Sequence, residues 1–355
     1  MEPLQNLKGR PDFEQFLKVL NRRGTPDHLP FYEHVASGEF IDAWMGVEIS
    51  KMPSHSRLRW KGYVDFWMSM GFDCVPMEIP LNCPLPPGHG PGEEARGAAS
   101  ESRVVISNMA DFEKYAWPPE SAPIDFAPFE IVADLLPDGA KIVGGVAMGP
   151  YEWASTMMGT EGMAFALVDE PEVVRLVFEK LGRLIVASDR QLATMKGIGA
   201  LRQGDDLGFK TGTFLSPTLM RELVFPIYTQ MTKVAHDAGM PFVLHSCGQL
   251  ADIYDDLIDN CHIDAKHSFE ETIMPVEQFK QKYGKRVTPL GGLDVDMVCR
   301  GTPEQLRKYT REKIEKCFGD GYWALGTGNS LTDYMPIQNY RMVLEEGLKV
   351  RGKGG

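Results

Sequence analysis

Short apolar runs that favour strands alternate along the chain with longer runs whose apolar residues recur at helical spacing, most clearly from about residue 130 onward. This alternation predicts parallel strands joined by crossover helices. Six of the expected strands lie in that part of the chain and two precede it. The eight expected strands are residues 29–35, 73–77, 141–148, 200–205, 242–245, 263–267, 287–291 and 322–325.

Three of the helices between these strands carry recognisable end signals, the first of them Pro171 in a first turn. Ser216 is a candidate N-cap and Gly239 a candidate C-cap of one of them. Thr302 is a candidate N-cap of another, with Pro303 in the first turn, where a missing N–H group is tolerated. The expected helices are residues 171–196, 217–239 and 302–318.

The number and order of these elements favour a closed barrel of the α/β class, a single (β/α)₈ TIM barrel. An open doubly wound sheet usually has a glycine-rich phosphate turn after its first strand, whereas here that strand is followed by Ala36-Ser37-Gly38-Glu39. A chain of 355 residues is also compatible with one barrel. We therefore predict one domain over residues 1–355, with residues 1–28 as an N-terminal helical extension. The Pro- and Gly-rich stretch 80–97 is expected to be a long loop at the mouth that could act as a lid.

Composition excludes several functions. The net charge of −12 argues against nucleic acid as a partner, because phosphate binding requires a basic surface. The six cysteines form no CxxC pair, which is typical of a reducing compartment. No window approaches the length of apolar sequence that a membrane helix needs. We therefore expect a cytoplasmic protein with no membrane association.

Polar residues end or directly follow nearly every expected strand, and barrel enzymes place their chemistry at the carboxyl ends of the strands. We expect these side chains to converge at the mouth, although loops are polar for other reasons too. The residues are Glu33, His34, Asp205, Asp206, His245, Cys247, His267, Asp294 and Asn329.

Two pairs among them have specific chemistry. His245 and Cys247 stand one residue apart after a strand, and an imidazole with a thiolate suits zinc, although either could be an ordinary structural residue. Asp205 and Asp206 are adjacent carboxylates, so one could have a raised pKa suited to proton transfer. The alternative is that one of them caps a helix or a turn near Leu207.

Several motifs resemble those of one known family. They are Met148-Gly149-Pro150-Tyr151-Glu152, Gly204-Asp205-Asp206-Leu207-Gly208, Leu215-Ser216-Pro217, His245-Ser246-Cys247-Gly248, Gly291-Gly292-Leu293-Asp294 and Gly328-Asn329-Ser330 with Pro336 and Asn339-Tyr340. As a set, over about residues 140–347, the chain resembles the uroporphyrinogen decarboxylase superfamily. The HxCG motif at His245 resembles its corrinoid-dependent methyltransferase branch. The decarboxylase itself has an arginine-rich segment after strand one, where this chain reads Phe31-Tyr32-Glu33-His34-Val35-Ala36.

The resemblance implies a methyltransferase that moves a methyl group from a small methylated substrate, such as an aryl methyl ether, to the cobalt of a separate corrinoid protein. It places His245 and Cys247 at zinc-ligand positions, and a homodimer is a compatible assembly. It implies catalytic roles for Glu33, Asp205, Asp206, His245 and Asn329, and substrate contacts for His34, Tyr151, His267 and Asp294.

One departure from this branch concerns the metal. The branch usually supplies a second cysteine from the loop after strand eight, and Gly326-Thr327-Gly328-Asn329-Ser330 contains none. Either another side chain completes a zinc site, with Glu33, Asp206, His267 and Asp294 as candidates, or no catalytic zinc binds. Two other functions stay open: a decarboxylase of a uroporphyrinogen-like or smaller acid, and a non-catalytic scaffold barrel.

Overall fold

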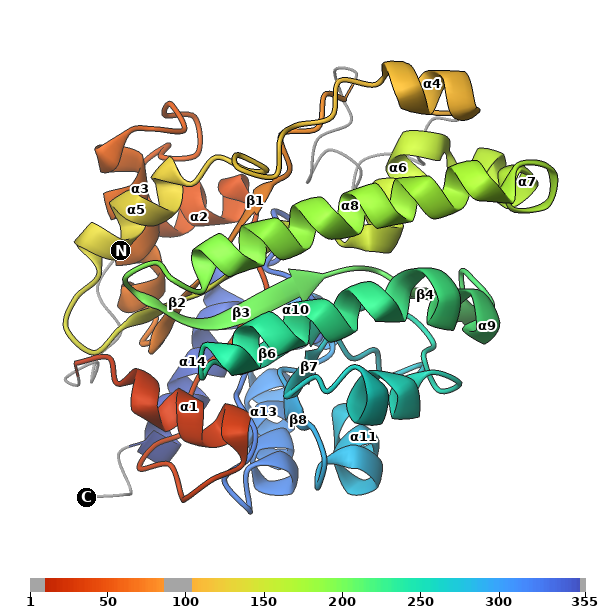
Figure 1. Ribbon diagram of the computed structural model, residues 1–355. Helices are drawn as coiled ribbons and strands as arrows, with labels where there is room; N and C mark the ends of the chain where they lie inside the picture. The colour runs from red at the N-terminus through yellow and green to blue at the C-terminus, as the bar shows by residue number, and fades with distance from the viewer. Residues whose placement is uncertain (1–9, 86–103, 352–355) are drawn as a thin grey trace.

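The computed structural model describes residues 10–85 and 104–351 of the chain. Six strands pair in parallel in the order β1-β2-β3-β6-β7-β8. Two further segments extend this sheet through single parallel bridges, Leu290 to Ala324 and Leu325 to Phe31. The eight segments form a TIM-barrel-like α/β fold, which confirms the predicted fold class (Figure 1). Most of the expected lid, residues 86–97, lies outside the described residues.

The strands and helices follow the predicted alternation. The strands are β1 Cys74–Pro80, β2 Lys141–Ala147, β3 Ile198–Gly204, β4 Gly208–Phe209, β5 Gly212–Thr213, β6 Phe242–His245, β7 Ala265–His267 and β8 Thr288–Leu290. The first helices are α1 Phe13–Asn21, α2 Gly38–Met45, α3 Arg57–Ser69, α4 Met109–Lys114, α5 Ala127–Leu135, α6 Pro150–Met158, α7 Thr160–Asp169 and α8 Pro171–Leu192. The later ones are α9 Pro217–Leu219, η3 Met220–Val224, α10 Phe225–Asp237, η4 Asp256–Asn260, α11 Val276–Tyr283, α12 Val295–Arg300, α13 Pro303–Cys317 and α14 Ile337–Arg351.

A separate hydrophobic cluster fills the lower part of the barrel. It takes one residue from each of the eight segments: Tyr32, Cys74, Val143, Ala200, Val243, Ala265, Leu290 and Ala324. Phe13, Phe16, Val19 and Leu20 of α1 belong to the same cluster. Because residues two apart on a strand face the same side, this cluster identifies the inward positions of every strand. Helix α1, which lies within the predicted N-terminal extension, therefore covers the barrel end opposite the mouth.

Among the described residues, no backbone bridge joins β1 to the segment around Phe31. Side chains connect the two instead. The Arg202 guanidinium donates to Glu78 of β1 and to the carbonyl oxygen of His34. At the other end, Arg351 donates to the carbonyl oxygens of Leu29 and Gly71. Two arginines thus close the barrel where the backbone does not.

The outer helices follow their end signals, with one difference. Helix α13 has the expected cap, in which Thr302 and Gln305 form a reciprocal capping box. The segment 217–239, expected as one helix, instead contains the π-helical turn η3, in which Phe225 donates to the carbonyl of Met220. Pro226 follows directly and has no N–H to donate, so a regular turn cannot be completed there.

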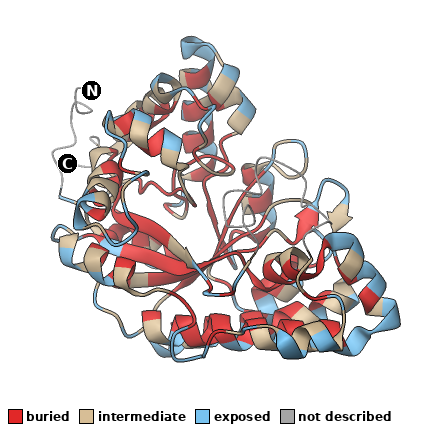
Figure 2. Cartoon of the chain, turned by 90° about the horizontal axis from the view of Figure 1, so that it is seen from above, coloured by how far each residue is buried: buried red, intermediate tan, exposed pale blue. Residues whose placement is uncertain are grey.

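Burial follows the barrel architecture. The strands are buried at the centre, and the surrounding helices expose their outer faces (Figure 2). Within the described residues, no helix is long and apolar enough to cross a membrane. The expected strand 29–35 is reduced to a single bridge at Phe31, and the expected strand 322–325 to bridges at Ala324 and Leu325.

Candidate functional site

Strand alternation gathers the chemically active side chains inside the upper barrel. On each strand, the residue two positions after the one in the apolar cluster again faces the barrel interior. His34 follows Tyr32 in this way, Arg202 follows Ala200, His245 follows Val243, and His267 follows Ala265. All four side chains are almost fully buried. The interior therefore changes from apolar to polar toward the carboxyl ends of the strands, where the sequence predicted the site.

The loops that follow β3 and β6 are joined by hydrogen bonds. Asp205 N donates to the carbonyl of His245 at 3.0 Å, and Leu207 N donates to Ser246 Oγ at 3.1 Å. Cys247 N donates to Asp206 Oδ1 at 2.9 Å. These contacts fix the backbone on both sides of the site before any ligand binds.

Gly208 and Gly248 allow the loops after β3 and β6 to approach each other this closely. Gly248 has φ +85°, and a Cβ added to it would lie 2.2 Å from the carbonyl carbon and oxygen of Gly208. A side chain there would be both strained and obstructed. This requirement explains a glycine directly after the His245-Ser246-Cys247 segment.

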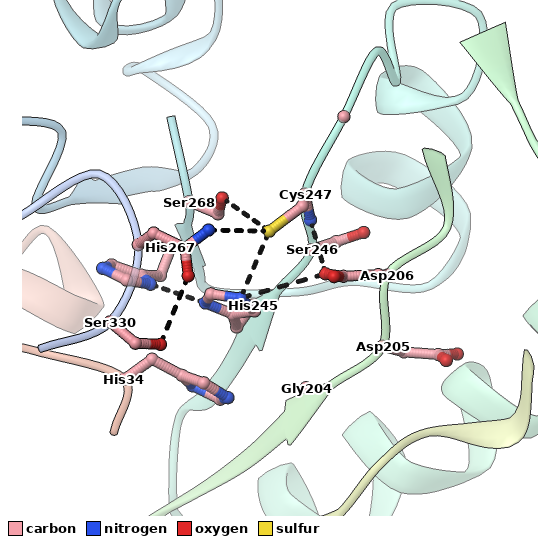
Figure 3. A network of polar contacts seen from close by, with 12 residues as sticks. His34, Gly204, Asp205, Asp206, His245, Ser246, Cys247, His267, Ser268 and Ser330 are labelled. Atoms are coloured by element: carbon pink, nitrogen blue, oxygen red, sulfur yellow. Dashed lines mark hydrogen bonds and ion pairs between the residues drawn. The ribbon is translucent and has the colours of Figure 1, made fainter. Parts of the chain in front are cut away.

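Asp206, His245 and Cys247 form the candidate metal-binding group (Figure 3). His245 Nε2 lies 3.6 Å from Cys247 Sγ and 3.9 Å from Asp206 Oδ1. The Asp206 side chain is 44% exposed, whereas that of His245 is 8% exposed. The three ligand atoms therefore converge with one partly open side. Of the four candidates for a third ligand, Asp206 is the one beside His245 and Cys247.

Hydrogen bonds behind His245 set its tautomer. His267 Nε2 lies 3.2 Å from the carbonyl oxygen of Thr327, which can only accept, so Nε2 of His267 carries the proton. His267 Nδ1 then accepts from His245 Nδ1 at 2.7 Å. The remaining nitrogen of His245, Nε2, is left with a free lone pair directed at Asp206 and Cys247. Such an arrangement is typical of histidines that ligate metals.

Burial shifts the pKa values of the group toward the neutral forms. Desolvation, followed by the nearby His267 and Arg202, holds the pKa of His245 well below its usual range. Desolvation and the Asp206 charge raise the pKa of the Cys247 thiol well above its usual range. The His245 ring is therefore neutral at neutral pH, with its one proton on Nδ1, whereas a metal would have to displace the thiol proton of Cys247.

Two further side chains contact the sulfur atom. Asn329 Nδ2 donates to Cys247 Sγ at 3.3 Å, and Ser268 Oγ lies 3.1 Å from Sγ. Asn329 thus contacts the thiol from the loop after the last strand, in which the sequence has no cysteine. In this arrangement its amide is a hydrogen-bond donor to sulfur, since its Oδ1 accepts from Ser330 at 3.2 Å.

Asp205 points away from this group and caps a helix. It accepts from the backbone N–H groups of Tyr151 and Glu152, at the start of α6, and from the hydroxyl of Tyr228. Its pKa is raised to about 7, mainly by burial and least by the adjacent Asp206. The capping alternative therefore describes Asp205, but the capped helix is α6 rather than a turn near Leu207.

Glu33 and Tyr151 also lie outside the group. Glu33 accepts from N and Oγ1 of Thr327 and from the hydroxyl of Tyr340, and burial raises its pKa to about 8. It therefore fixes the loop whose carbonyl binds His267. The ring of Tyr151 stacks on Phe214 with centroids 5.3 Å apart.

His34 offers an alternative set of metal ligands that its neighbours disfavour. Its ring stacks on His245 with centroids 3.9 Å apart, and the nitrogens of His34, His245 and His267 lie within 4.8 Å of one another. However, His34 Nε2 faces Arg202 Nη2 at 3.1 Å, and the facing nitrogens of His245 and His267 bond each other. The buried guanidinium would also repel a cation.

A large cavity adjoins the group at the mouth. It has a volume of about 1430 Å³ and is lined by Glu78, Glu270, Asp294, Asn329 and other residues from the loops. Asn329 both lines the cavity and contacts Cys247. Asp294 lines it while capping α12 through a bond from Met297 N at 2.8 Å. Asn329 therefore lies between the cavity and the sulfur of Cys247.

Several residues of the site were not singled out from the sequence. Arg202 and Glu78 could have been found by counting two positions along each strand from an inward residue. Ser268 directly follows His267, but its contact with sulfur depends on a left-handed backbone with φ 80°. No sequence pattern indicates that conformation for a serine.

Comparison with known proteins supports the fold alone. No protein-family model and no curated protein matches the chain. A methyltransferase from Methanosarcina mazei has a similar structure, with a TM-score of 0.66, 16% identity, and coverage of 96% of this chain and 97% of that one. A structure described as a vitamin-B12-independent methionine synthase from Listeria monocytogenes has a TM-score of 0.46, 11% identity, and coverage of 92% and 96%. The latter score is too low to carry an argument.

Proposed function

We propose that this protein is a methyltransferase that transfers a methyl group from a small donor to the cobalt of a separate corrinoid protein. The observation that carries the proposal is the convergence of Asp206, His245 and Cys247 beside the cavity at the barrel mouth. The HxCG resemblance and the shared fold with a methyltransferase support it. An aryl methyl ether is a suitable donor, because its methyl group is bonded to an oxygen that must be stabilised as it leaves.

The three side chains fit a zinc ion. A tetrahedral ion with ligand bonds of about 2.0–2.3 Å places its ligand atoms roughly 3.3–3.8 Å apart. The separations of 3.6 and 3.9 Å from His245 Nε2 are close to that range. Three protein ligands leave a fourth position for a substrate, as in catalytic zinc sites. When bound, zinc would supply a Lewis acid that stabilises negative charge on the departing oxygen.

The chain's own residues prepare this site in three ways. The Thr327 carbonyl and His267 keep the lone pair of His245 Nε2 directed outward. Asn329 and Ser268 hold the sulfur of Cys247 in place by hydrogen bonds. The walls of the cavity would shield one side of a bound donor from water. Together these groups would orient the donor oxygen toward Asp206, His245 and Cys247 and leave its methyl group facing the mouth.

The size of the cavity supports a second reactant. Pockets for small ligands usually measure about 300–1,000 Å³. A small methylated donor would leave much of the 1430 Å³ unfilled. The face of a corrinoid carried by a partner protein would occupy the remaining space and bring cobalt to the methyl group.

The charge of the cavity wall disfavours the decarboxylase alternative. Among the described residues the lining contains seven carboxylates and one arginine, Arg59. The carboxylates are Glu39, Glu78, Glu270, Glu271, Asp294, Asp296 and Asp333. A uroporphyrinogen-like substrate carries many carboxylates, which arginines would bind and acidic side chains would repel.

A turnover assay separates the three candidate functions. The protein is mixed with cob(I)alamin and a panel of methylated donors, and methylcobalamin is followed by its visible spectrum while released CO₂ is measured. We expect methylcobalamin to form with wild type and not with Cys247→Ser. Release of CO₂ without methylcobalamin would support the decarboxylase, and neither product with any donor would support the scaffold.

A further inference from the structure

Lys266 is a buried lysine that the proposed mechanism does not use. It lies on β7 between Ala265 and His267, which face the barrel interior, so its side chain points outward under the helices. The residue is 2% exposed, and its Nζ lies 4.2 Å from the ring centroid of Phe269. Tyr254 and Phe279 lie on other sides, each with its centroid 5.9 Å from Nζ.

The surroundings of this ammonium offer little to offset its burial. Among the described residues no carboxylate lies within ion-pair distance of Lys266. Burying a lysine without a carboxylate partner costs several kcal/mol, and cation–π contacts recover about 2 kcal/mol each when desolvated. A methionine of similar length would fill the same space at a lower cost in folding free energy. Folding stability therefore does not explain a lysine at this position, and its charge and its hydrogen bond point to another role.

That hydrogen bond goes to the residue that holds the sulfur. Lys266 Nζ donates to the carbonyl oxygen of Ser268. Ser268 has φ 80°, a left-handed conformation that costs a serine about 1 kcal/mol or more. In this conformation Ser268 Oγ lies 3.1 Å from Cys247 Sγ. The strained residue is thus held on one side by Lys266 and contacts the candidate ligand on the other.

We propose that Lys266 is a positioning residue for the thiolate of Cys247: it holds Ser268 in the left-handed conformation from which the hydroxyl donates to the sulfur. The inference rests on the proposed metal site at Asp206, His245 and Cys247. Without Lys266, Ser268 relaxes to a favourable backbone conformation and its hydroxyl leaves the sulfur. The thiolate then loses one of its two hydrogen-bond donors and the metal is held more weakly.

Metal binding tests the proposal independently of turnover. Co²⁺ is titrated into the metal-free protein, and the near-ultraviolet charge-transfer band from thiolate to cobalt gives both the affinity and the presence of the sulfur ligand. We expect Lys266→Met and Ser268→Ala each to weaken binding about 10- to 100-fold, the usual effect of removing support around a ligand. The double variant should bind no more weakly than Ser268→Ala, because both residues act through one hydrogen bond.

Lys313 provides the matched control. It is also a buried lysine, 3% exposed, but it pairs with Glu271 and Glu277 away from the sulfur. Lys313→Met should lower the melting temperature and leave the Co²⁺ affinity unchanged. Melting curves of all variants identify any that fail to fold. If Lys266→Met does not fold, Ser268→Ala still tests the contact with sulfur, because it removes only one buried hydroxyl.

The outcomes separate this inference from the proposed function. Wild-type affinity in a folded Lys266→Met protein, or additive losses in the double variant, would overturn the role of Lys266 while leaving the metal site intact. A wild-type protein that gives no charge-transfer band would overturn both.

Discussion

His245 is prepared as a ligand by atoms on the far side of its ring. The Thr327 carbonyl fixes the proton of His267, and His267 in turn fixes the proton of His245. Glu33 holds Thr327 through two hydrogen bonds. A backbone carbonyl and a buried carboxyl group thus decide which nitrogen of His245 carries the proton, although neither contacts Asp206 or Cys247.

A different buried carboxyl group, Asp189 in α8, carries a prediction about stability and pH. It is fully buried, neither oxygen has a hydrogen-bond partner among the described residues, and desolvation raises its pKa well above the usual range. A raised pKa in the folded state means that stability is highest at low pH and falls as pH rises from about 4 toward the folded pKa, by about 1.4 kcal/mol per unit. Asp189→Asn removes this dependence. The melting temperature of Asp189→Asn minus that of wild type should therefore rise between pH 5 and pH 8. A difference that stays constant with pH would contradict the raised pKa of Asp189.

Glu33 and Asp205 show what the sequence could predict at the residue scale. Both follow a strand and both were expected at the mouth. A strand alternates its side chains, and the parity of a short strand cannot be read from polar residues alone. Tyr32 and Gly204 face inward, so the residue after each points outward, to Tyr340 in one case and to α6 in the other. His245 and Cys247 were identifiable from their motif.

At the level of elements, the loops after β3 and β6 act as one unit. Their close approach depends on Gly208 and Gly248, where a Cβ on Gly248 would collide with backbone at 2.2 Å. Gly239, at the end of α10, has a similar φ of +73° but nothing within 4 Å of an added Cβ. Gly239 and Gly248 therefore have similar φ angles, but only at Gly248 would an added Cβ collide with neighbouring atoms.

This pair gives a controlled test of the loop contact. Gly239→Ala should cost about 1 kcal/mol of unfolding free energy, the penalty for a left-handed alanine. Gly248→Ala should cost more and should also lose metal affinity, because the loop carrying Cys247 must move away from Asp206. Urea unfolding and metal titration measure both effects. Equal losses of stability with intact metal binding would show that the loops tolerate separation.

The strands were more predictable than their connections. Expected strands 141–148, 200–205 and 242–245 agree closely with β2, β3 and β6, because buried parallel strands are continuous apolar runs. The hairpin of β4 and β5 was missed, since its two-residue strands carry no periodicity. The π-helical turn η3 depends on how Pro226 is accommodated, which local propensity does not specify.

For the molecule as a whole, the acidic cavity wall predicts selectivity by charge. With an effective dielectric constant of 20, one net like charge 10 Å away repels an anion by about 1.7 kcal/mol. A neutral methoxyphenol should therefore be demethylated with roughly tenfold higher kcat/KM than a methoxybenzoate of the same shape. The difference should shrink as salt is added, because salt screens exposed charges. Faster turnover of the anionic donor would contradict this picture of the cavity.

The barrel, the joined loops and the hydrogen bonds behind His245 all lead to one claim, that Asp206, His245 and Cys247 hold a metal at the mouth. Zinc K-edge X-ray absorption of the zinc-loaded protein tests that claim most directly. We predict one sulfur at about 2.3 Å together with nitrogen and oxygen ligands at about 2.0–2.1 Å. The sulfur shell should disappear in Cys247→Ser. A spectrum without sulfur in the wild-type protein, or an unchanged spectrum in the variant, would contradict the account.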